Sequence, residues 1–377
     1  MIFVAETKSG EIIRYKDTKR YLWLLSLTVP LVPVVSIALY LWLGKQEWLL
    51  VLPAFYFYAF IPLMDYIFGE DTANPPSEVV EEMSNDSYYR WLLHASVPLF
   101  WLSFLTTAWL VGTQDLSWWA FLFITISAGF AAGTGLTVGH ELGHKHSRLD
   151  RFSAMLVNAV TGYGHFCIEH NKGHHTWVAT PEDLASARFN ESVYAFSRRE
   201  IPGAFMRGWL HEKERLTRKD LPVWHWRNEI LQGYGVTFVA TVTLIWVFGW
   251  IMVPFILLHH AAGWHMLTFA NYVEHYGLKR AKRDNGRYEP VQPHHSWNTN
   301  HIVSNLMLFH LQRHSDHHAN PMRPYQALRN FDELPRLPSG YPGSFVLAMI
   351  PPLWFKVMNP KVMAWAGGDL DKVNTGT

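Results

Sequence analysis

Cysteine and charged residues are scarce in this sequence. The 377 residues include one cysteine, Cys167, which excludes a disulfide framework, a zinc ribbon and a four-cysteine iron centre within the chain. Charged residues make up 17% of the chain, below the roughly 25% of an average globular protein. The formal net charge is only +1, so the chain lacks the strong positive charge of a nucleic-acid-binding protein, and no nucleic-acid partner is expected.

Apolar residues are abundant instead, and they gather in long segments. Hydrophobic residues make up 49% of the chain and aromatic residues 15%. Six segments are long enough to cross about 30 Å of hydrocarbon, namely 21–43, 48–68, 91–111, 118–139, 230–250 and 251–272. Hydropathy leaves open whether the last two are separate spans or one long helix followed by a dipping segment. The sequence therefore predicts an all-α fold, a six-helix transmembrane bundle that forms a single integral-membrane domain over residues 1–377.

Lysine and arginine are distributed unequally around these segments. They are frequent in the first 20 residues and in segment 140–229, whereas the loop 112–117 has none. Because cytoplasmic loops carry an excess of lysine and arginine, we expect the cytoplasm to contain both termini and the segments 140–229 and 276–377.

The 21 histidines are the most unusual feature of the composition. Eight of them fall in three boxes with helical spacing, and a ninth stands alone where the sixth span ends. They are His140 and His144, then His170, His174 and His175, then His275, and finally His314, His317 and His318. Neutral imidazole is a common metal ligand, and one ion accepts about four to six ligands. Nine converging histidines at the cytoplasmic rim of the bundle therefore predict a site for two metal ions.

The first box also fits a different class of enzyme. His140-Glu141-Leu142-Gly143-His144 matches the H-E-x-x-H pattern of zinc peptidases, with Glu141 as general base and one remote third ligand. A membrane zinc peptidase is thus an alternative function. It accounts for two histidines of the nine and leaves seven without a role.

The boxes resemble those of the histidine-rich membrane di-iron family of desaturases and hydroxylases. Residues 140–145, 169–183, 271–278 and 311–325 resemble more closely the signatures of bacterial alkane 1-monooxygenases, and the resemblance runs along nearly the whole chain. Leu184 departs from the family, which usually has proline there. The resemblance implies terminal hydroxylation of n-alkanes to 1-alkanols with O2, in the bacterial inner membrane. A membrane di-iron fatty-acyl desaturase or hydroxylase, or another hydrocarbon monooxygenase, is the nearest alternative.

The resemblance also implies that the nine histidines ligate two non-haem iron ions. Ligating histidines usually donate their second N–H to a carboxylate or carbonyl group. The carboxylates expected in that role are Glu141, Glu169, Glu182, Asp183, Glu274 and Asp316. The other twelve histidines are expected not to bind metal; they include His146, His165, His294, His295, His301 and His310.

Substrate length and electron supply are the two remaining expectations from the resemblance. In the family a bulky residue of the second span limits the accepted chain length, and its position within the aromatic run 55–60 corresponds to Phe57. The chain has no flavin or nicotinamide fingerprint, so electrons must come from outside. The family uses rubredoxin, served by a reductase, and basic residues such as Arg198 and Arg199 are expected to attract it. The polar tail 367–377 is suited as a linker to such a module.

Overall fold

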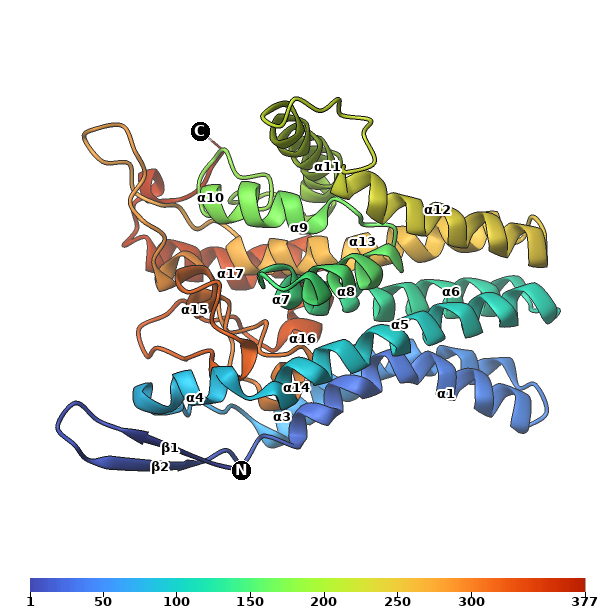
Figure 1. Ribbon diagram of the computed structural model, residues 1–377, viewed down its shortest axis with the longest axis horizontal. Coiled ribbons are helices and arrows are strands. Elements are labelled where there is room, and N and C mark those ends of the chain that lie inside the picture. Colours follow the sequence, from blue (N-terminus) through green and yellow to red (C-terminus); the bar gives the residue numbers. More distant parts are fainter. Residues whose placement is uncertain (377) are drawn as a thin grey trace.

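The computed structural model describes residues 1–376, and nearly all regular structure in it is helical (Figure 1). The exception is an N-terminal hairpin in which β1 (Ile2–Glu6) pairs with β2 (Ile12–Lys16) in antiparallel register. The all-α prediction omits this hairpin. Its apolar and polar residues alternate over only five positions per strand, which is a weak signal beside the charged residues around it.

Five helical segments are long and apolar enough to cross a membrane within the described chain. They are Leu22–Trp42, which contains α1 (Thr28–Trp42); Glu47–Phe68, which contains α2 (Leu52–Phe55), a π-helical turn at Tyr56–Phe60 and α3 (Ile61–Phe68); α5 (Ser87–Thr113); Trp118–Gly143, which joins α6 (Trp118–Gly133) to α7 (Gly135–Gly143); and α12 (Glu229–Phe248). These segments agree with the first five predicted spans to within a few residues.

A sixth long helix, α13 (Met252–His275), follows α12 after a short turn. Gly249 ends α12 with a φ of 77°, a left-handed conformation that favours glycine, so a single long helix across this point is excluded. α13 is less apolar than the other five because it carries histidines, an asparagine and a glutamate. Figure 1 shows α12 and α13 as a helical hairpin, with α13 lying beside α6.

Small residues bring α6 and α13 into close contact. Gly129 and Gly133 lie four residues apart on α6. A Cβ added to Gly129 would lie 2.4 Å from the His259 carbonyl oxygen, and one added to Gly133 would lie 2.7 Å from the Gly263 carbonyl oxygen. Such small residues at four-residue spacing allow membrane helices to approach closely. Because α6 leads into the first histidine box and α13 ends at His275, this seam fixes the distance between those parts of the site.

Replacing Gly133 by valine is expected to destabilise the protein by about 1–3 kcal/mol, because the new side chain overlaps Met266 and the backbone of Gly263. The apparent melting temperature in detergent measures the effect. Gly235→Val in α12 is the matched control, since a Cβ at Gly235 meets nothing within 4 Å. Equal melting temperatures for the two variants would contradict the tight seam.

The remaining helices gather at one end of the membrane helices (Figure 1). They are α4 (Val80–Asn85), α8 (Arg148–Ala159), α9 (Phe166–Glu169), α10 (His175–Trp177), α11 (Val193–Thr217), α14 (Ile302–Met307), α15 (His314–Ala319), α16 (Tyr341–Ala348) and α17 (Pro351–Trp365). Two of the four predicted histidine segments lie in or next to these helices, and the other two are the ends of α7 and α13. The core here contains Trp297, Tyr325, Tyr341 and Trp354, all fully buried.

The C-terminal tail is docked onto this region. The Asn374 backbone N–H donates to the Gly277 carbonyl at 3.0 Å, and its carbonyl accepts from the Phe189 N–H at 2.7 Å. The Asn374 residue is 1% exposed. The prediction of a linker over 367–377 is therefore wrong up to Asn374, and Thr377 lies outside the described residues.

Candidate metal centre

The nine predicted histidines come together in two adjacent groups. The five-histidine group contains His140, His144, His170, His175 and His317, and the four-histidine group contains His174, His275, His314 and His318. Within each group one nitrogen of every ring lies within 4.8 Å of the corresponding nitrogens of the others. The other histidines of the described chain lie outside both groups.

The second box divides between the groups because its backbone is π-helical. In a regular helix His170 and His174 would share one face. Residues 170–174 instead form a π-helical turn, in which hydrogen bonds span five residues. This turn places His170 opposite His175, with their Nε2 atoms 3.0 Å apart, and directs His174 into the other group.

The third box also serves both groups, but in a regular helix. His314 and His318 lie one turn apart on α15, and their Nε2 atoms are 2.8 Å apart in the four-histidine group. His317 points from the neighbouring face to His175, with an Nε2–Nε2 distance of 3.1 Å. Two pairs of consecutive residues, 174/175 and 317/318, thus supply one side chain to each group.

The nitrogen spacing fits metal ions with more than four ligands. The Nε2–Nε2 distances between neighbouring rings are 2.8–3.2 Å. For an imidazole–metal bond of about 2.1 Å, ligands at 90° lie about 3.0 Å apart and tetrahedral ligands about 3.4 Å apart. In addition, the Nε2 atoms of His140, His144 and His174 are buried without a protein partner. Two cations would satisfy these nitrogens, so the residues present fit a two-metal site.

Burial keeps the two rings His317 and His318 in the form that binds metal. It lowers the pKa of the His317 and His318 imidazoles well below their ordinary value, and the neighbouring histidines lower both further. Both rings are therefore neutral at pH 7 and keep a lone pair for an ion.

Asp183 orients His174 in the four-histidine group. The His174 Nδ1–H donates to Asp183 Oδ2 at 2.9 Å, which leaves the Nε2 lone pair facing the group. Arg207 donates to Asp183 Oδ1 at 3.0 Å and through Nε to Glu169 Oε1 at 2.8 Å. Burial alone would raise the pKa of the Asp183 carboxyl, but His174 and Arg207 hold it well below its usual range. Arg207 was not expected from the sequence, because it lies in no motif.

A backbone carbonyl and a carboxylate contact two further histidines of this site. The His275 Nδ1–H donates to the His295 carbonyl at 3.3 Å. Glu274 Oε2 lies 3.2 Å from His314 Nε2, and Glu274 Oε1 accepts from the Tyr341 hydroxyl at 2.6 Å. Tyr341, like Arg207, carries no sequence signal of its role.

The other expected carboxylates have different partners in the described chain. Glu141 pairs with Lys145 at 3.1 Å, and Glu182 accepts from the Tyr288 hydroxyl at 2.7 Å. Asp316 accepts from Arg323 and from the Arg329 backbone N–H at 2.8 Å. Glu169 accepts from Arg207 Nε at 2.8 Å. For Glu141 and Asp316, adjacency in sequence to a histidine therefore did not predict contact with one, because neighbouring helical side chains point about 100° apart.

Glu289, His294 and His295 form a third group of metal-binding residue types. Its hydrogen bonds account for its arrangement without an ion. The His295 Nδ1 accepts from the Gln292 N–H at 2.9 Å, so the neutral ring carries its proton on Nε2 and donates to Glu289 Oε1 at 3.2 Å. This ring has no lone pair left for a metal. His301 lies 2.5 Å from the Thr299 hydroxyl, and His310 donates to the Tyr325 carbonyl at 3.0 Å, both away from the two groups.

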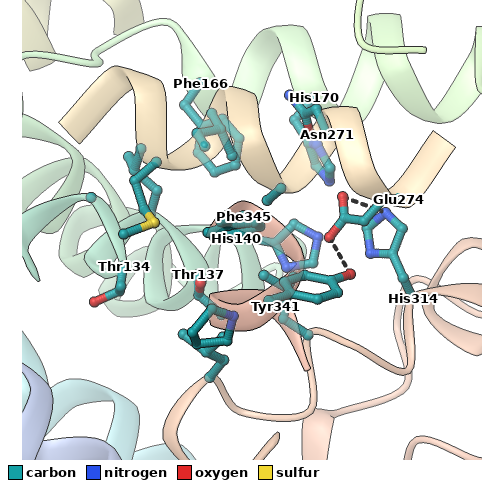
Figure 2. A pocket seen from close by; sticks show the side chains of 18 of the residues that line it. Thr134, Thr137, His140, Phe166, His170, Asn271, Glu274, His314, Tyr341 and Phe345 are labelled. Atoms are coloured by element: carbon teal, nitrogen blue, oxygen red, sulfur yellow. Dashed lines mark hydrogen bonds and ion pairs between the residues drawn. The ribbon is translucent and has the colours of Figure 1, made fainter. Parts of the chain in front are cut away.

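A narrow apolar pocket leads to both histidine groups (Figure 2). Its wall includes His140 and His170 of the five-histidine group and His314 of the four-histidine group. The other lining side chains are mostly apolar, and they come from α6, α7, α9, α13, α16, the segment 308–311 and the π-helical turn at Tyr56–Phe60. Phe57 belongs to this wall and is 4% exposed, whereas Phe55 of the same aromatic run is 56% exposed.

Known proteins with similar sequences point to one enzyme class. The fatty acid desaturase family model matches residues 116–344. The chain is 52% identical to an alkane 1-monooxygenase of Ectopseudomonas oleovorans over 95% of this chain and 89% of the relative. It is 50% identical to alkane 1-monooxygenase 1 of Alcanivorax borkumensis over the same shares. A more distant similarity, 29% identity over 61% of each chain, is to the xylene/toluene monooxygenase hydroxylase component XylM of Pseudomonas putida.

Proposed function

The chain belongs to the fatty acid desaturase family and, within it, to the alkane 1-monooxygenases, and from this premise we propose that it hydroxylates the terminal carbon of n-alkanes to give 1-alkanols with O2. The observation that carries this proposal is the apolar pocket that ends at both histidine groups. A substrate without polar atoms fits such a wall, and the histidine groups supply the reactive end.

We propose that the nine histidines hold two non-haem iron ions. When bound, these ions supply the reductive activation of dioxygen and the transfer of one oxygen atom to a C–H bond. The protein fixes the ring orientations of His174 and His275 through Asp183 and the His295 carbonyl, and burial lowers the pKa of the His317 and His318 imidazoles. Carboxylate and carbonyl partners of this kind fix the tautomer of a ligating histidine.

The pocket selects its substrate by shape. Moving a methylene group from water into an apolar site is worth about 0.8 kcal/mol, but an alkane already dissolved in lipid has gained this energy before it binds. Hydrophobicity therefore does not discriminate between chain lengths here. We propose that Phe57, in the wall of the pocket, limits the length that fits.

We propose that the whole chain is one inner-membrane domain with α13 as its sixth span. Exposed tryptophans surround the helix ends remote from the histidines: Trp42, Trp48, Trp118, Trp246 and Trp250. The loops at that end carry one basic residue, Lys45, whereas Lys145, Arg148 and Arg151 follow the first histidine box at the other end. Tryptophan belts and basic cytoplasmic loops are typical of membrane proteins, so this distribution supports a cytoplasmic site and cytoplasmic termini.

The geometry disfavours a zinc peptidase. His140 and His144 lie among five imidazoles rather than the three protein ligands of a catalytic zinc. Glu141, the residue that would act as general base, pairs with Lys145 at 3.1 Å.

Metal analysis combined with product analysis tests the function. Purified protein is expected to contain about two iron ions per chain and, with an electron donor and O2, to convert members of a mixed-length n-alkane series to the matching 1-alkanols, identified by gas chromatography. One zinc per chain with peptide cleavage would replace this function with the peptidase. An alkene or a desaturated acyl chain as the main product would replace it with a desaturase.

We propose that rubredoxin supplies the electrons and is attracted by exposed basic residues such as Arg198. Arg198→Glu is expected to lower rubredoxin-supported turnover several-fold at low salt, and the difference should vanish at high salt because exposed charges are screened. Arg199 does not test docking, because it pairs with Glu191 at 2.9 Å and donates to the Leu184 carbonyl at 3.1 Å. Turnover that depends on neither salt nor Arg198 would refute electrostatic docking at this residue.

A further inference from the structure

Glu274 is a buried carboxylate that lacks a basic partner. It lies in the last turn of α13, immediately before His275, and is 1% exposed. Asp183 and Glu169 share Arg207, Asp316 pairs with Arg323, and Glu141 pairs with Lys145. Among residues 1–376, the structure gives Glu274 no ion pair with lysine or arginine. A buried charge is costly unless an opposite charge compensates it, and a cation bound beside Glu274 would supply that charge.

The two carboxylate oxygens of Glu274 face different partners. Figure 2 shows the side chain between His314 and Tyr341, at the edge of the apolar pocket. Oε1 accepts from the Tyr341 hydroxyl at 2.6 Å, and Oε2 lies 3.2 Å from His314 Nε2. His314 Nε2, the nitrogen next to Oε2, also faces the four-histidine group. It lies 3.2 Å from His275 Nε2 and 2.8 Å from His318 Nε2.

A metal ion resolves this contact. When His314 Nε2 binds an ion it carries no proton, so it has no hydrogen to donate to Glu274. The nitrogen lone pair and the carboxylate would then repel each other unless both faced the same cation. The separation of 3.2 Å between Oε2 and His314 Nε2 equals that between His314 Nε2 and His275 Nε2, so Oε2 lies as close to His314 as another ligand of the same ion would.

We propose that Glu274 is a fifth protein ligand of the ion held by the four-histidine group, with Oε2 as the donor atom. This inference rests on the proposed di-iron function and deepens it. Each group then offers five donors, five imidazoles in one and four imidazoles with a carboxylate in the other. The carboxylate gives the second ion an anionic oxygen ligand, which the first lacks, so the two ions are chemically unequal.

Tyr341 is a positioning residue for this ligand. Its hydroxyl donates to Oε1 and thereby keeps Oε2 directed at the four-histidine group. The Tyr341 backbone N–H donates to Gln312 Oε1 at 2.8 Å, which ties the start of α16 to the segment that carries His314. The tyrosine is therefore fixed relative to the same histidine that lies beside Glu274.

Iron content and Mössbauer spectra of protein labelled with 57Fe test the proposal. Glu274→Gln keeps the size of the side chain but removes its charge, and it is expected to weaken iron binding in one group by about 100-fold or more, leaving about one iron per chain. Tyr341→Phe is expected to retain two irons and to change the quadrupole splitting of one of them. Glu200→Gln is the matched control, because Glu200 is a fully buried carboxylate bonded to Thr268 and Asn271 of α13, and it should retain two irons with unchanged spectra.

The possible outcomes separate this inference from the proposed function. Wild-type protein without iron would overturn the di-iron function and this ligand with it. Two irons and unchanged spectra in Glu274→Gln would overturn the ligand and leave the function intact. If Glu274→Gln does not fold, Tyr341→Phe decides, and spectra identical to wild type in that variant would refute the proposal.

Discussion

Replacing His275 by alanine is expected to reduce the iron content from about two ions to about one per chain and to lower hydroxylation by at least about 100-fold. His275 supplies one of the four ring nitrogens in its group, 3.2 Å from His314 Nε2. It is also the only histidine of the two groups that α13 contributes. Its loss removes the link between the membrane helix and the third box. Iron analysis and alkanol production measured on the same preparation check both parts of the prediction.

His265→Ala is the matched control for this variant. His265 lies on the same helix, belongs to neither histidine group and contacts the Ala261 carbonyl at 2.7 Å. It is expected to retain iron and activity. Full iron content and wild-type turnover in His275→Ala would refute the assignment of His275 as a ligand.

Replacing Phe57 by leucine or serine is expected to shift the products toward longer alkanols. A chain that is too long must displace this ring from a packed wall, at a cost of about 1–3 kcal/mol, or about 5- to 150-fold in relative rate. The smaller side chain removes that cost, while short alkanes lose little because they do not reach the ring. The product distribution from an equimolar mixture of alkanes of increasing length measures the shift.

The aromatic run that contains Phe57 supplies the controls. Phe55→Leu changes an exposed ring outside the pocket wall and should leave the distribution unchanged. Tyr56 donates its hydroxyl toward Met307 or Thr28, and Tyr58 packs against Phe130 with ring centroids 5.8 Å apart. A shift caused by Tyr56→Leu or Tyr58→Leu, with none from Phe57, would mean that the gate lies on another face of the same helix.

The membrane helices could be predicted well because their signal is local. The length of an apolar run can be read directly from the sequence. The turn at Gly249 could not be predicted in the same way, because the runs 230–250 and 251–272 are continuous and hydropathy does not separate them. The membership of the nine-histidine set was also predictable, since three dense boxes and a histidine at a helix end are rare by chance. What the sequence did not show is how the set divides, because a π-helical turn at His170–His174 has the same residues as an α-helical one.

The partners of the histidines were less predictable for a different reason. Glu141 and Asp316 were expected to contact histidines because they stand beside them in the sequence, yet each pairs with a nearby basic residue. Arg207 and Tyr341 reach the site from 38 and 67 residues away from their partners Glu169 and Glu274. Contacts over such separations depend on the tertiary packing of α11 and α16, which no local pattern encodes.

The docked tail has a consequence for coupling the enzyme to an electron carrier. The backbone of Asn374 is bonded to Gly277, two residues beyond His275, so a module joined after the tail would start from a fixed point close to the four-histidine group. A short flexible linker keeps the attached module at an effective concentration in the millimolar range, and this concentration falls as the linker lengthens. Fusing a carrier at this terminus would thus make electron delivery an intramolecular event governed by tether length rather than by the amount of carrier in the cell.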